Sequence, residues 1–199
     1  MLTLDCEEKV LLHKCEYESL VDELGDKGNT FVQTNYYFDR PDGSLANEGI
    51  TCRIREKSGQ YEATIKAHGI GRNGGNVEAS VAAQDEKDIT LFHELDVELM
   101  GSLLTTRVSV CQDDFEIALD KNEYLGCVDY ELEVEYSPYA KTSDDVLGYM
   151  AELLYPNDAD AKEHVCARVK KTLSKAKRFF ERKRKLKRKK GRKGEIYDG

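Results

Sequence analysis

Residues 128–136 have the sequence VDYELEVEY, in which apolar and acidic side chains alternate without interruption. This alternation predicts a β-strand, because successive side chains of a strand point to opposite faces of the sheet. One face of the strand carries four carboxylates: Asp129, Glu131, Glu133 and Glu135. Like charges about 7 Å apart along a strand repel one another. Solvent, neighbouring basic strands or a bound divalent cation must therefore offset this repulsion.

The polar faces of other predicted strands are also sorted by sign. An early strand, within residues 3–13, places these charged residues on one face: Asp5, Glu7 and Lys9. A predicted hairpin at residues 50–67 presents basic side chains instead: Arg53, Arg55 and Lys66. If the strands close into a barrel with these faces inward, the interior suits a highly anionic ligand bridged to carboxylates by Mg²⁺ or Mn²⁺. The alternative is an open sheet whose charged faces are solvated.

The remaining patterns predict an α+β fold with eight antiparallel strands and flanking helices. The predicted strands are residues 3–13, 30–39, 50–57, 60–67, 77–82, 103–111, 115–124 and 128–136. Helices are predicted at residues 16–24 and 144–154, as short segments within 85–100, and as one long helix from about residue 160 through the C-terminal basic run. Turns or loops are predicted at residues 40–43, 58–59, 68–76 and 113–114.

Charge divides the chain into an acidic body and a basic end. Residues 1–167 contain 14 Lys and Arg against 35 Asp and Glu, a net charge of −21, whereas residues 168–199 contain 16 against 3, a net charge of +13. The run at 182–190 is suited to a polyanion such as nucleic acid or polyphosphate, although no Tyr or Trp is interleaved to stack on bases. A solvated helix end is the alternative interpretation.

Composition excludes several classes of protein. The chain has 199 residues, 40% of them hydrophobic, which is enough for a globular core, and no run approaches the ~20 apolar residues of a membrane-spanning helix. The N-terminus is acidic within eight residues and lacks the pattern of a signal peptide. The six cysteines form no C-x-x-C, and the four histidines are scattered. We therefore expect a cytoplasmic protein with reduced thiols and no zinc site.

Several motifs, taken in order along the chain, resemble those of the CYTH domains, also called triphosphate tunnel metalloenzymes. Asp5-Cys6-Glu7-Glu8-Lys9 resembles the family's E-x-E-x-K strand, with Asp in place of the first Glu. Later segments resemble its R-x-R, T-x-K, tunnel-arginine, L-D and closing E-x-E motifs: Arg53-Ile54-Arg55, Thr64-Ile65-Lys66, Thr106-Arg107, Leu119-Asp120 and Glu131-Leu132-Glu133. The likeness is strongest to bacterial members described as candidate adenylate cyclases.

This resemblance implies an eight-stranded antiparallel β-barrel whose tunnel binds a triphosphate, with the domain at residues 1–180 and a basic C-terminal tail at 181–199. It implies that phosphate oxygens are held by Lys9, Arg53, Arg55, Lys66, Arg107 and Lys175, the first five also being catalytic. It implies that Mg²⁺ or Mn²⁺ is bound by Asp5, Glu7, Glu78, Glu131 and Glu133. An alignment shifted by two residues places Glu133 and Glu135 in the closing motif instead.

The activity implied by the resemblance is metal-dependent hydrolysis of inorganic triphosphate or of a small organic triphosphate. Two alternatives remain open at the level of sequence. One is a class IV-type adenylate cyclase, which makes cyclic AMP from ATP by the same charged tunnel. The other is a non-catalytic module that binds polyphosphate or RNA ends, with the basic tail contributing a polyanion contact.

Overall fold

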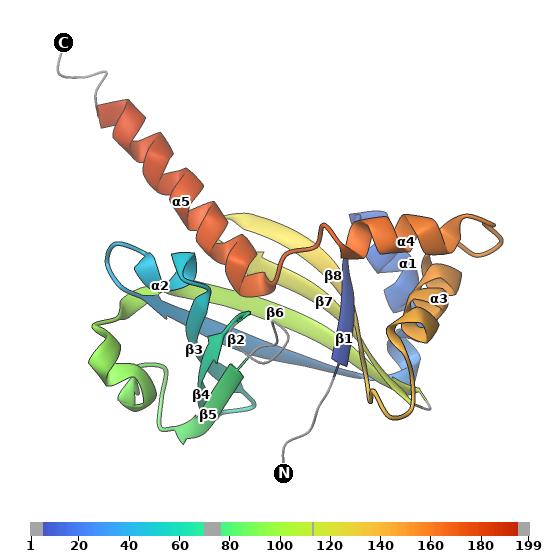
Figure 1. Cartoon of the computed structure of the whole chain (residues 1–199), viewed down its shortest axis with the longest axis horizontal. Helices are drawn as coiled ribbons and strands as arrows, with labels where there is room; N and C mark the ends of the chain where they lie inside the picture. The colour runs from blue at the N-terminus through green and yellow to red at the C-terminus, as the bar shows by residue number, and fades with distance from the viewer. Residues whose placement is uncertain (1–5, 70–76, 113, 195–199) are drawn as a thin grey trace. The chain divides into compact units, whose positions relative to one another are not determined.

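A computed structural model of the chain describes residues 6–69, 77–112 and 114–194, with side chains described up to residue 189. Its elements in chain order are β1 (Cys6–Leu12), α1 (Lys14–Leu24), η1 (Gly25–Lys27), β2 (Asn29–Asp39), α2 (Ser44–Asn47), β3 (Ile50–Lys57), β4 (Gln60–Ala67), β5 (Val77–Ala83), η3 (Thr90–Leu95), β6 (Glu98–Gln112), β7 (Phe115–Tyr124), β8 (Cys127–Tyr136), α3 (Ser143–Leu154), α4 (Ala161–Val169) and α5 (Lys175–Gly194) (Figure 1).

The strands form one eight-stranded sheet in the order β1-β8-β7-β6-β2-β3-β4-β5. The pairings of β1 with β8, β2 with β3, β3 with β4 and β4 with β5 are antiparallel. The predicted fold class, an antiparallel eight-stranded sheet with flanking helices, is therefore confirmed. Within the described residues, β1 and β5 stand at the two ends of this order rather than joining a closed ring.

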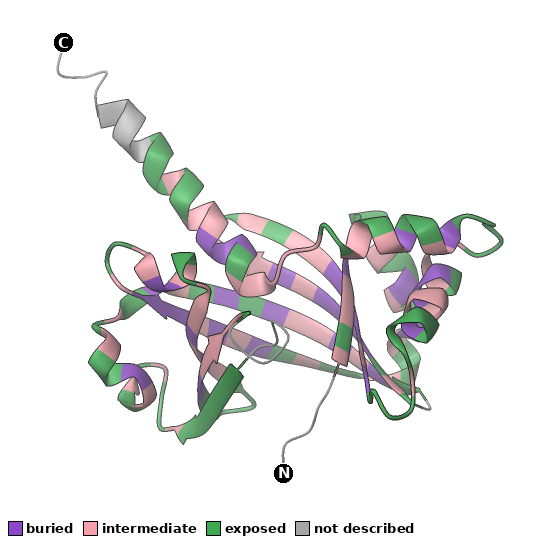
Figure 2. Ribbon diagram, in the orientation of Figure 1, coloured by how far each residue is buried: buried purple, intermediate pink, exposed green. Residues whose placement is uncertain are grey.

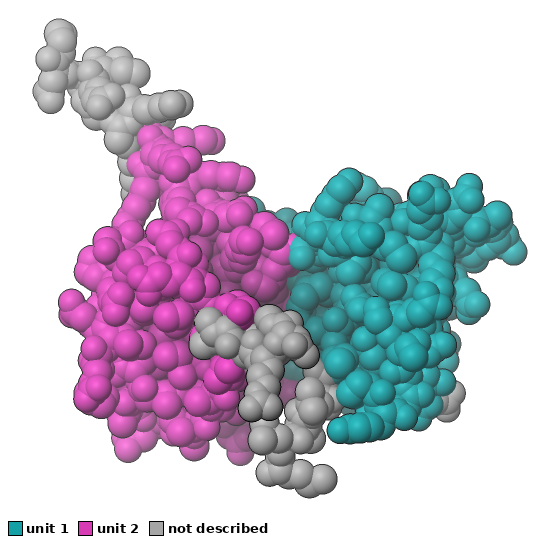
Figure 3. Space-filling view, viewed as in Figure 1, with its two compact units in different colours: residues 1–32, 105–123, 127–172 teal, residues 33–104, 124–126, 173–199 magenta. Residues whose placement is uncertain are grey.

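The chain divides into two compact units, which Figure 3 colours separately. Unit 1 contains residues 1–32, 105–123 and 127–172, and unit 2 contains residues 33–104, 124–126 and 173–199.

The core of unit 1 lies between its strands and the helices α1, α3 and α4 (Figure 2). The alternation of β8 explains this arrangement, because Leu132 and Val134 are fully buried in the core while the intervening glutamates occupy the other face. Val146 and Met150 of α3 and Val165 of α4 pack against the same cluster. Unit 1 therefore buries one face of its sheet under helices and leaves the opposite face to charged side chains.

The core of unit 2 is smaller and is built on β2, β3 and β4. Phe38, Cys52 and Ile54 are buried there, and Phe92 of η3 packs on Phe38 with a ring separation of 5.3 Å. The η3 segment confirms the prediction of short helices within residues 85–100. The hairpin turn between β3 and β4 is also as predicted, with Ser58 and Gly59 both at positive φ.

The single long helix predicted from residue 160 onward is wrong, because α4 ends at Val169 and α5 begins at Lys175. Thr172 donates its hydroxyl to the Arg168 carbonyl oxygen (3.0 Å) and accepts a hydrogen bond from the Leu11 backbone N–H (3.3 Å). Ser174 accepts the backbone N–H of Lys177 at the start of α5. Ser and Thr hydroxyls compete with helical backbone bonds in this way, and the charge pattern of the run did not reveal the interruption.

Candidate functional site

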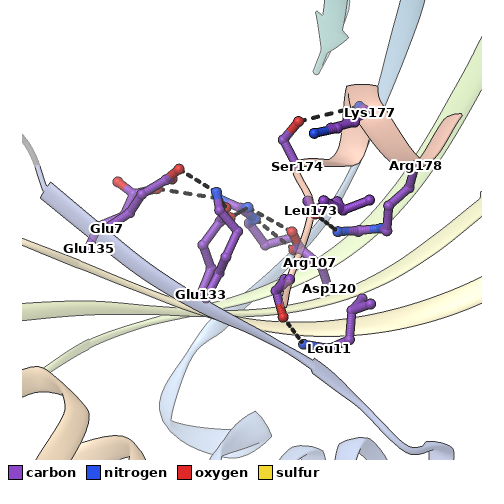
Figure 4. Close-up of polar contacts among 12 residues, drawn as sticks. Glu7, Leu11, Arg107, Asp120, Glu133, Glu135, Leu173, Ser174, Lys177 and Arg178 are labelled. Atoms are coloured by element: carbon purple, nitrogen blue, oxygen red, sulfur yellow. Dashed lines mark hydrogen bonds and ion pairs between the residues drawn. The ribbon is translucent and has the colours of Figure 1, made fainter. Parts of the chain in front are cut away.

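Charged side chains line the face of the unit 1 sheet opposite the helices, and we call six of them the carboxylate cluster (Figure 4). Its members come from four strands: Glu7 and Lys9 of β1, Arg107 of β6, Asp120 of β7, and Glu133 and Glu135 of β8. Pairing of β1 with β8 places Glu7 opposite Glu135 and Lys9 opposite Glu133. Strand alternation and register, rather than sequence proximity, therefore bring these side chains together.

Arg107 is the best-connected cation of the carboxylate cluster. Its Nε and one Nη donate to the two oxygens of Asp120, each at 2.7 Å, in a bidentate pair. The same Nη donates to Glu133 Oε2 at 2.5 Å, whereas the other Nη lies 4.0 Å from Glu135 Oε1. Burial opposes a charge on Arg107, but the bonds and charges of Asp120 and Glu133 outweigh it and raise its pKa above the usual value. The guanidinium is therefore a permanent, oriented positive charge.

Lys9 is the second cation of the carboxylate cluster. Its Nζ contacts Glu7 Oε1 and lies 3.4 Å from Glu133 Oε1. Burial lowers the pKa of Lys9, but the charges of Glu133 and Glu7 outweigh burial and raise that pKa. Lys9 therefore stays protonated at neutral pH, and it shares one carboxylate, Glu133, with Arg107.

Negative charge exceeds positive charge in the carboxylate cluster, with four carboxylates against two cations. Among the residues that the structure describes, Glu7, Glu133 and Glu135 bring one oxygen each to within 4.8 Å of one another. Burial, and secondly the charge of Glu133, raise the pKa of Glu135, although Arg107 lowers it in part. Clustered carboxylate oxygens are the ligands that Mg²⁺ and Mn²⁺ prefer, so the donor set fits a hard divalent cation.

The other predicted metal ligands are not part of this three-carboxylate group. Glu131 lies on the same face of β8 but is fully buried and pairs in register with Leu11 of β1. The alignment shifted by two residues, which favoured Glu133 and Glu135, matches the observed grouping better. Asp5 lies outside the described residues. Glu78 belongs to unit 2, where cations surround it.

Unit 2 contains a second set of charged side chains, which we call the cationic cluster. Its predicted members are Arg53 and Arg55 of β3, Lys66 of β4 and Glu78 of β5. Lys66 lies directly opposite Glu78 in the β4–β5 pairing, and its Nζ is 3.1 Å from Glu78 Oε2. One Nη of Arg53 is 4.0 Å from Glu78 Oε1, and the buried Arg53 Nε has no hydrogen-bond partner among the described residues. Positive charge is thus in excess in this cluster.

Arg55 is oriented by a neighbouring strand. Its Nε donates to Asn35 Oδ1 at 3.1 Å, and the two residues are directly opposed in the β2–β3 pairing. Asn35 is itself buried, so its amide fixes the guanidinium without neutralising it.

The N-terminal end of α5 adds further positive charge to unit 2. Tyr37 is fully buried, which raises the pKa of its hydroxyl, and the charges of four cations counteract that rise: Arg53, Lys175, Arg55 and Arg178. The ring of Tyr37 packs on Phe179 of α5 with centroids 4.9 Å apart. The charge of Lys175 therefore acts on the same buried hydroxyl as the charges of Arg53 and Arg55.

The sequence identified Asp120 only as part of the L-D motif and assigned no site role to Asp120, Asn35 or Arg178. The contact of Asp120 with Arg107 could have been predicted, because a hairpin with a two-residue turn at 113–114 places position 107 opposite position 120. Asn35 lies in the strand predicted at residues 30–39, where no charged side chain precedes Asp39. Arg178 was hidden among many basic neighbours, and no local pattern distinguishes it.

Family comparison identifies the fold. The profile of the CYTH domain matches residues 4–155, which is most of the chain and includes both sets of charged strands. This chain belongs to the CYTH domain family. No curated protein sequence matches it significantly.

Solved structures agree with the family assignment. A candidate adenylate cyclase from Bacillus halodurans has a TM-score of 0.58 and 22% identity, with 89% of this chain and 98% of that chain covered. A candidate adenylyl cyclase from Hippeastrum, whose dominant activity is that of a triphosphatase, has a TM-score of 0.60 and 16% identity over 87% and 99% of the two chains. A protein from Pyrococcus horikoshii has a TM-score of 0.53 and 21% identity, with 76% of this chain and 90% of that chain covered. At these identities the comparisons support the fold.

The helices of this CYTH chain offer no candidate for a membrane span: none in the described part is both long and apolar enough.

Proposed function

We propose that this CYTH chain is a divalent-metal-dependent triphosphatase that hydrolyses inorganic triphosphate or a small organic triphosphate. The observation that carries the proposal is the carboxylate cluster, where three carboxylates suited to a hard cation lie together. One of them, Glu133, also accepts a hydrogen bond from Arg107, a side chain suited to a phosphate. Membership of the CYTH family and the triphosphatase activity of the Hippeastrum protein support it.

In this proposal Glu7, Glu133 and Glu135 hold Mg²⁺ or Mn²⁺. The cation, when bound, supplies positive charge that neutralises triphosphate oxygens and offsets the repulsion among the three carboxylates. Asp5 and Glu131 remain predicted ligands from the family resemblance. Glu78 is assigned differently, because its oxygens contact Lys66 and lie near Arg53.

Each cluster contains cations that we propose to bind phosphate oxygens. Arg107 is held by Asp120 through two of its nitrogens, and its remaining Nη, 4.0 Å from Glu135, is the donor that we assign to phosphate. Arg53 has a buried donor nitrogen without a protein partner in the described residues, which an anionic oxygen would satisfy. Lys9, Arg55, Lys66 and Lys175 complete the proposed set.

The proposed reaction is phosphoryl transfer to water. The water oxygen bonds to the terminal phosphorus, the bridging P–O bond breaks, diphosphate leaves, and the water proton passes to solvent. Such transfer depends mainly on positioning and on stabilising charge at the phosphoryl oxygens. Loss of one buried charged contact is therefore expected to reduce the rate by about 10²-fold or more.

Phosphate release from tripolyphosphate and from ATP, with Mg²⁺, Mn²⁺ or EDTA, tests the proposal. We expect turnover only with a divalent cation, and its loss in the Arg53→Ala, Arg55→Ala double variant. A charge-matched double variant at exposed lysines, Lys14→Gln with Lys87→Gln, is the control and should remain active.

Product analysis separates the alternatives. Hydrolysis of ATP yields phosphate, whereas a cyclase yields cyclic AMP and diphosphate. Tight metal-dependent binding of tripolyphosphate without any turnover would favour a binding module and contradict the triphosphatase.

A further inference from the structure

The distal part of α5 is an exposed cationic surface that the proposed triphosphatase does not use. Beyond the segment that packs on unit 2, four described side chains are exposed to solvent: Lys185, Lys187, Arg188 and Lys189. Among the described residues, none of these four takes part in a hydrogen bond or an ion pair. The charges are therefore available to an external partner.

The proximal part of α5 fixes this surface on unit 2. Phe179 is fully buried and Phe180 nearly so, and both pack on Tyr37. Two further side chains extend from the helix to backbone carbonyls: Arg182 Nε donates to Leu125 O (3.4 Å), and Lys183 donates to Met100 O. These contacts hold the helix in place before any partner binds. Binding at its distal charges therefore does not require the whole helix to lose conformational entropy.

The composition of the surface favours phosphate groups over an acidic protein. Protein interfaces depend on apolar and aromatic anchors at their centre. Beyond Arg184 the described part of α5 offers only one apolar side chain, the half-buried Leu186. The same lack of an apolar face argues against insertion into a membrane surface, which needs a stripe of large apolar residues.

The absence of stacking groups favours a duplex over a single strand. Single-stranded nucleic acid is bound by aromatic side chains on which successive bases stack. The two aromatic residues of α5, Phe179 and Phe180, are buried in unit 2, so they are not available to stack on bases. A duplex displays about one phosphate charge per 1.7 Å of its length and is bound by lysine and arginine alone.

We propose that the distal cationic surface of α5 binds the phosphate backbone of duplex nucleic acid, without reading its sequence. This role is separate from the proposed hydrolysis, because Lys185, Arg188 and Lys189 lie outside both clusters. The net charge of −21 on residues 1–167 confines the attraction to the helical end of the chain.

Fluorescence anisotropy of the full chain with blunt 24-base-pair DNA and RNA duplexes tests this role. The duplexes carry 5′-hydroxyl ends, so no triphosphate is present. We expect micromolar binding at low salt, a linear decrease of log K with log salt, and little sequence preference. The triple variant Lys185→Gln, Arg188→Gln, Lys189→Gln should bind at least tenfold more weakly and lose about 2 to 3 units of salt slope. Comparison of the two duplexes identifies which nucleic acid binds.

The matched control removes three exposed lysines elsewhere: Lys14→Gln, Lys27→Gln, Lys87→Gln. Both triple variants lower the net charge equally, so only a local role of α5 separates them. Equal weakening in the two variants, or no binding by the unmodified chain, would overturn the proposal. So would equally tight binding of polyglutamate or phosphatidylserine vesicles. The Arg53→Ala, Arg55→Ala variant should bind duplexes normally, which keeps this test independent of hydrolysis.

Discussion

Glu7 lies directly opposite Glu135 in the antiparallel pairing of β1 with β8, so two carboxylates of like charge face each other across adjacent strands. Glu133 contributes a third oxygen within 4.8 Å of theirs. The charges of Lys9 and Arg107 do not balance the group, and the pKa of Glu135 stays above its usual range. The repulsion is the energetic reason to expect a bound cation, and it leads to the first prediction.

Replacing Glu135 by Gln should reduce the stabilisation of the protein by a divalent cation. Without the cation, the variant should be at least as stable as the unmodified chain. The amide keeps the shape of the side chain but removes one of three mutually repelling charges. We expect the affinity for Mn²⁺ to fall at least tenfold. Each tenfold loss of affinity lowers the stabilisation of the folded chain by Mn²⁺ by about 1.4 kcal/mol. Thermal unfolding with and without MnCl₂ measures both effects, and Glu152→Gln, on the exposed surface of α3, is the control.

Equal stabilisation of the Glu135→Gln and unmodified chains by Mn²⁺ would show that Glu135 is not a ligand.

Arg107 and Asp120 should behave as an energetic unit. Asp120 is fully buried and receives two hydrogen bonds of 2.7 Å from the guanidinium. Arg107→Ala removes both of these hydrogen bonds and the positive charge beside a buried carboxylate, so we expect a loss of about 3–5 kcal/mol in the free energy of unfolding. Asp120→Asn combined with Arg107→Ala should cost clearly less than the two single changes added together. Urea unfolding of the four proteins gives the coupling energy, and additive losses would contradict the pairing.

The sequence predicted several strands of this fold well because they carry their own alternation, whereas β6 begins at Glu98, five residues before the predicted strand. VDYELEVEY at 128–136 and the Ser58-Gly59 turn are local signals that do not depend on distant residues. The break between α4 and α5 was missed, because Thr172 and Ser174 interrupt the helix through hydroxyl contacts that a charge pattern does not contain.

The sequence predicted which types of residue form the candidate site better than it predicted which of those residues lie together. Which glutamate of β8 faces Glu7 depends on the register between β1 and β8, two strands more than a hundred residues apart in the chain. No local feature sets that register, so Glu131 and Glu135 could not be separated from the sequence. Lys66 and Glu78 were both identified, but their ion pair follows from the register between β4 and β5.

Glu78 is expected to orient cations rather than to bind metal. Its carboxylate lies 3.1 Å from Lys66 Nζ and 4.0 Å from an Arg53 Nη. In the proposed triphosphatase, Glu78→Gln should therefore raise the KM for tripolyphosphate several-fold while the Mn²⁺ concentration for half-maximal rate stays the same. Steady-state kinetics with each component varied separately distinguishes the two roles, and Glu86→Gln serves as control in the same unit. A higher Mn²⁺ requirement would restore Glu78 as a ligand.

The pair of Glu16 with Arg168 should make the stability of unit 1 depend on pH in the acid range. Arg168 donates to both oxygens of Glu16 at 2.7 and 2.8 Å, and also to the Leu11 carbonyl oxygen, which ties α4 to α1 and β1. Burial raises the pKa of Glu16, but the bonds from Arg168 and His13 outweigh it and bring that pKa below its ordinary value of 4.5.

Because the folded pKa of Glu16 is depressed, its contribution is complete above the unfolded value near 4.5 and is lost as the pH falls through the folded value. Glu16→Gln should therefore destabilise the chain at pH 7 by about 1.5–3 kcal/mol, and the difference should shrink progressively below pH 4.5. Urea unfolding from pH 7 to pH 3 measures the difference. Glu18→Gln, at an exposed position on the same helix that pairs with Lys14, should show little effect. A Glu16→Gln difference that stays constant across this range would mean that the Glu16 charge does not stabilise unit 1.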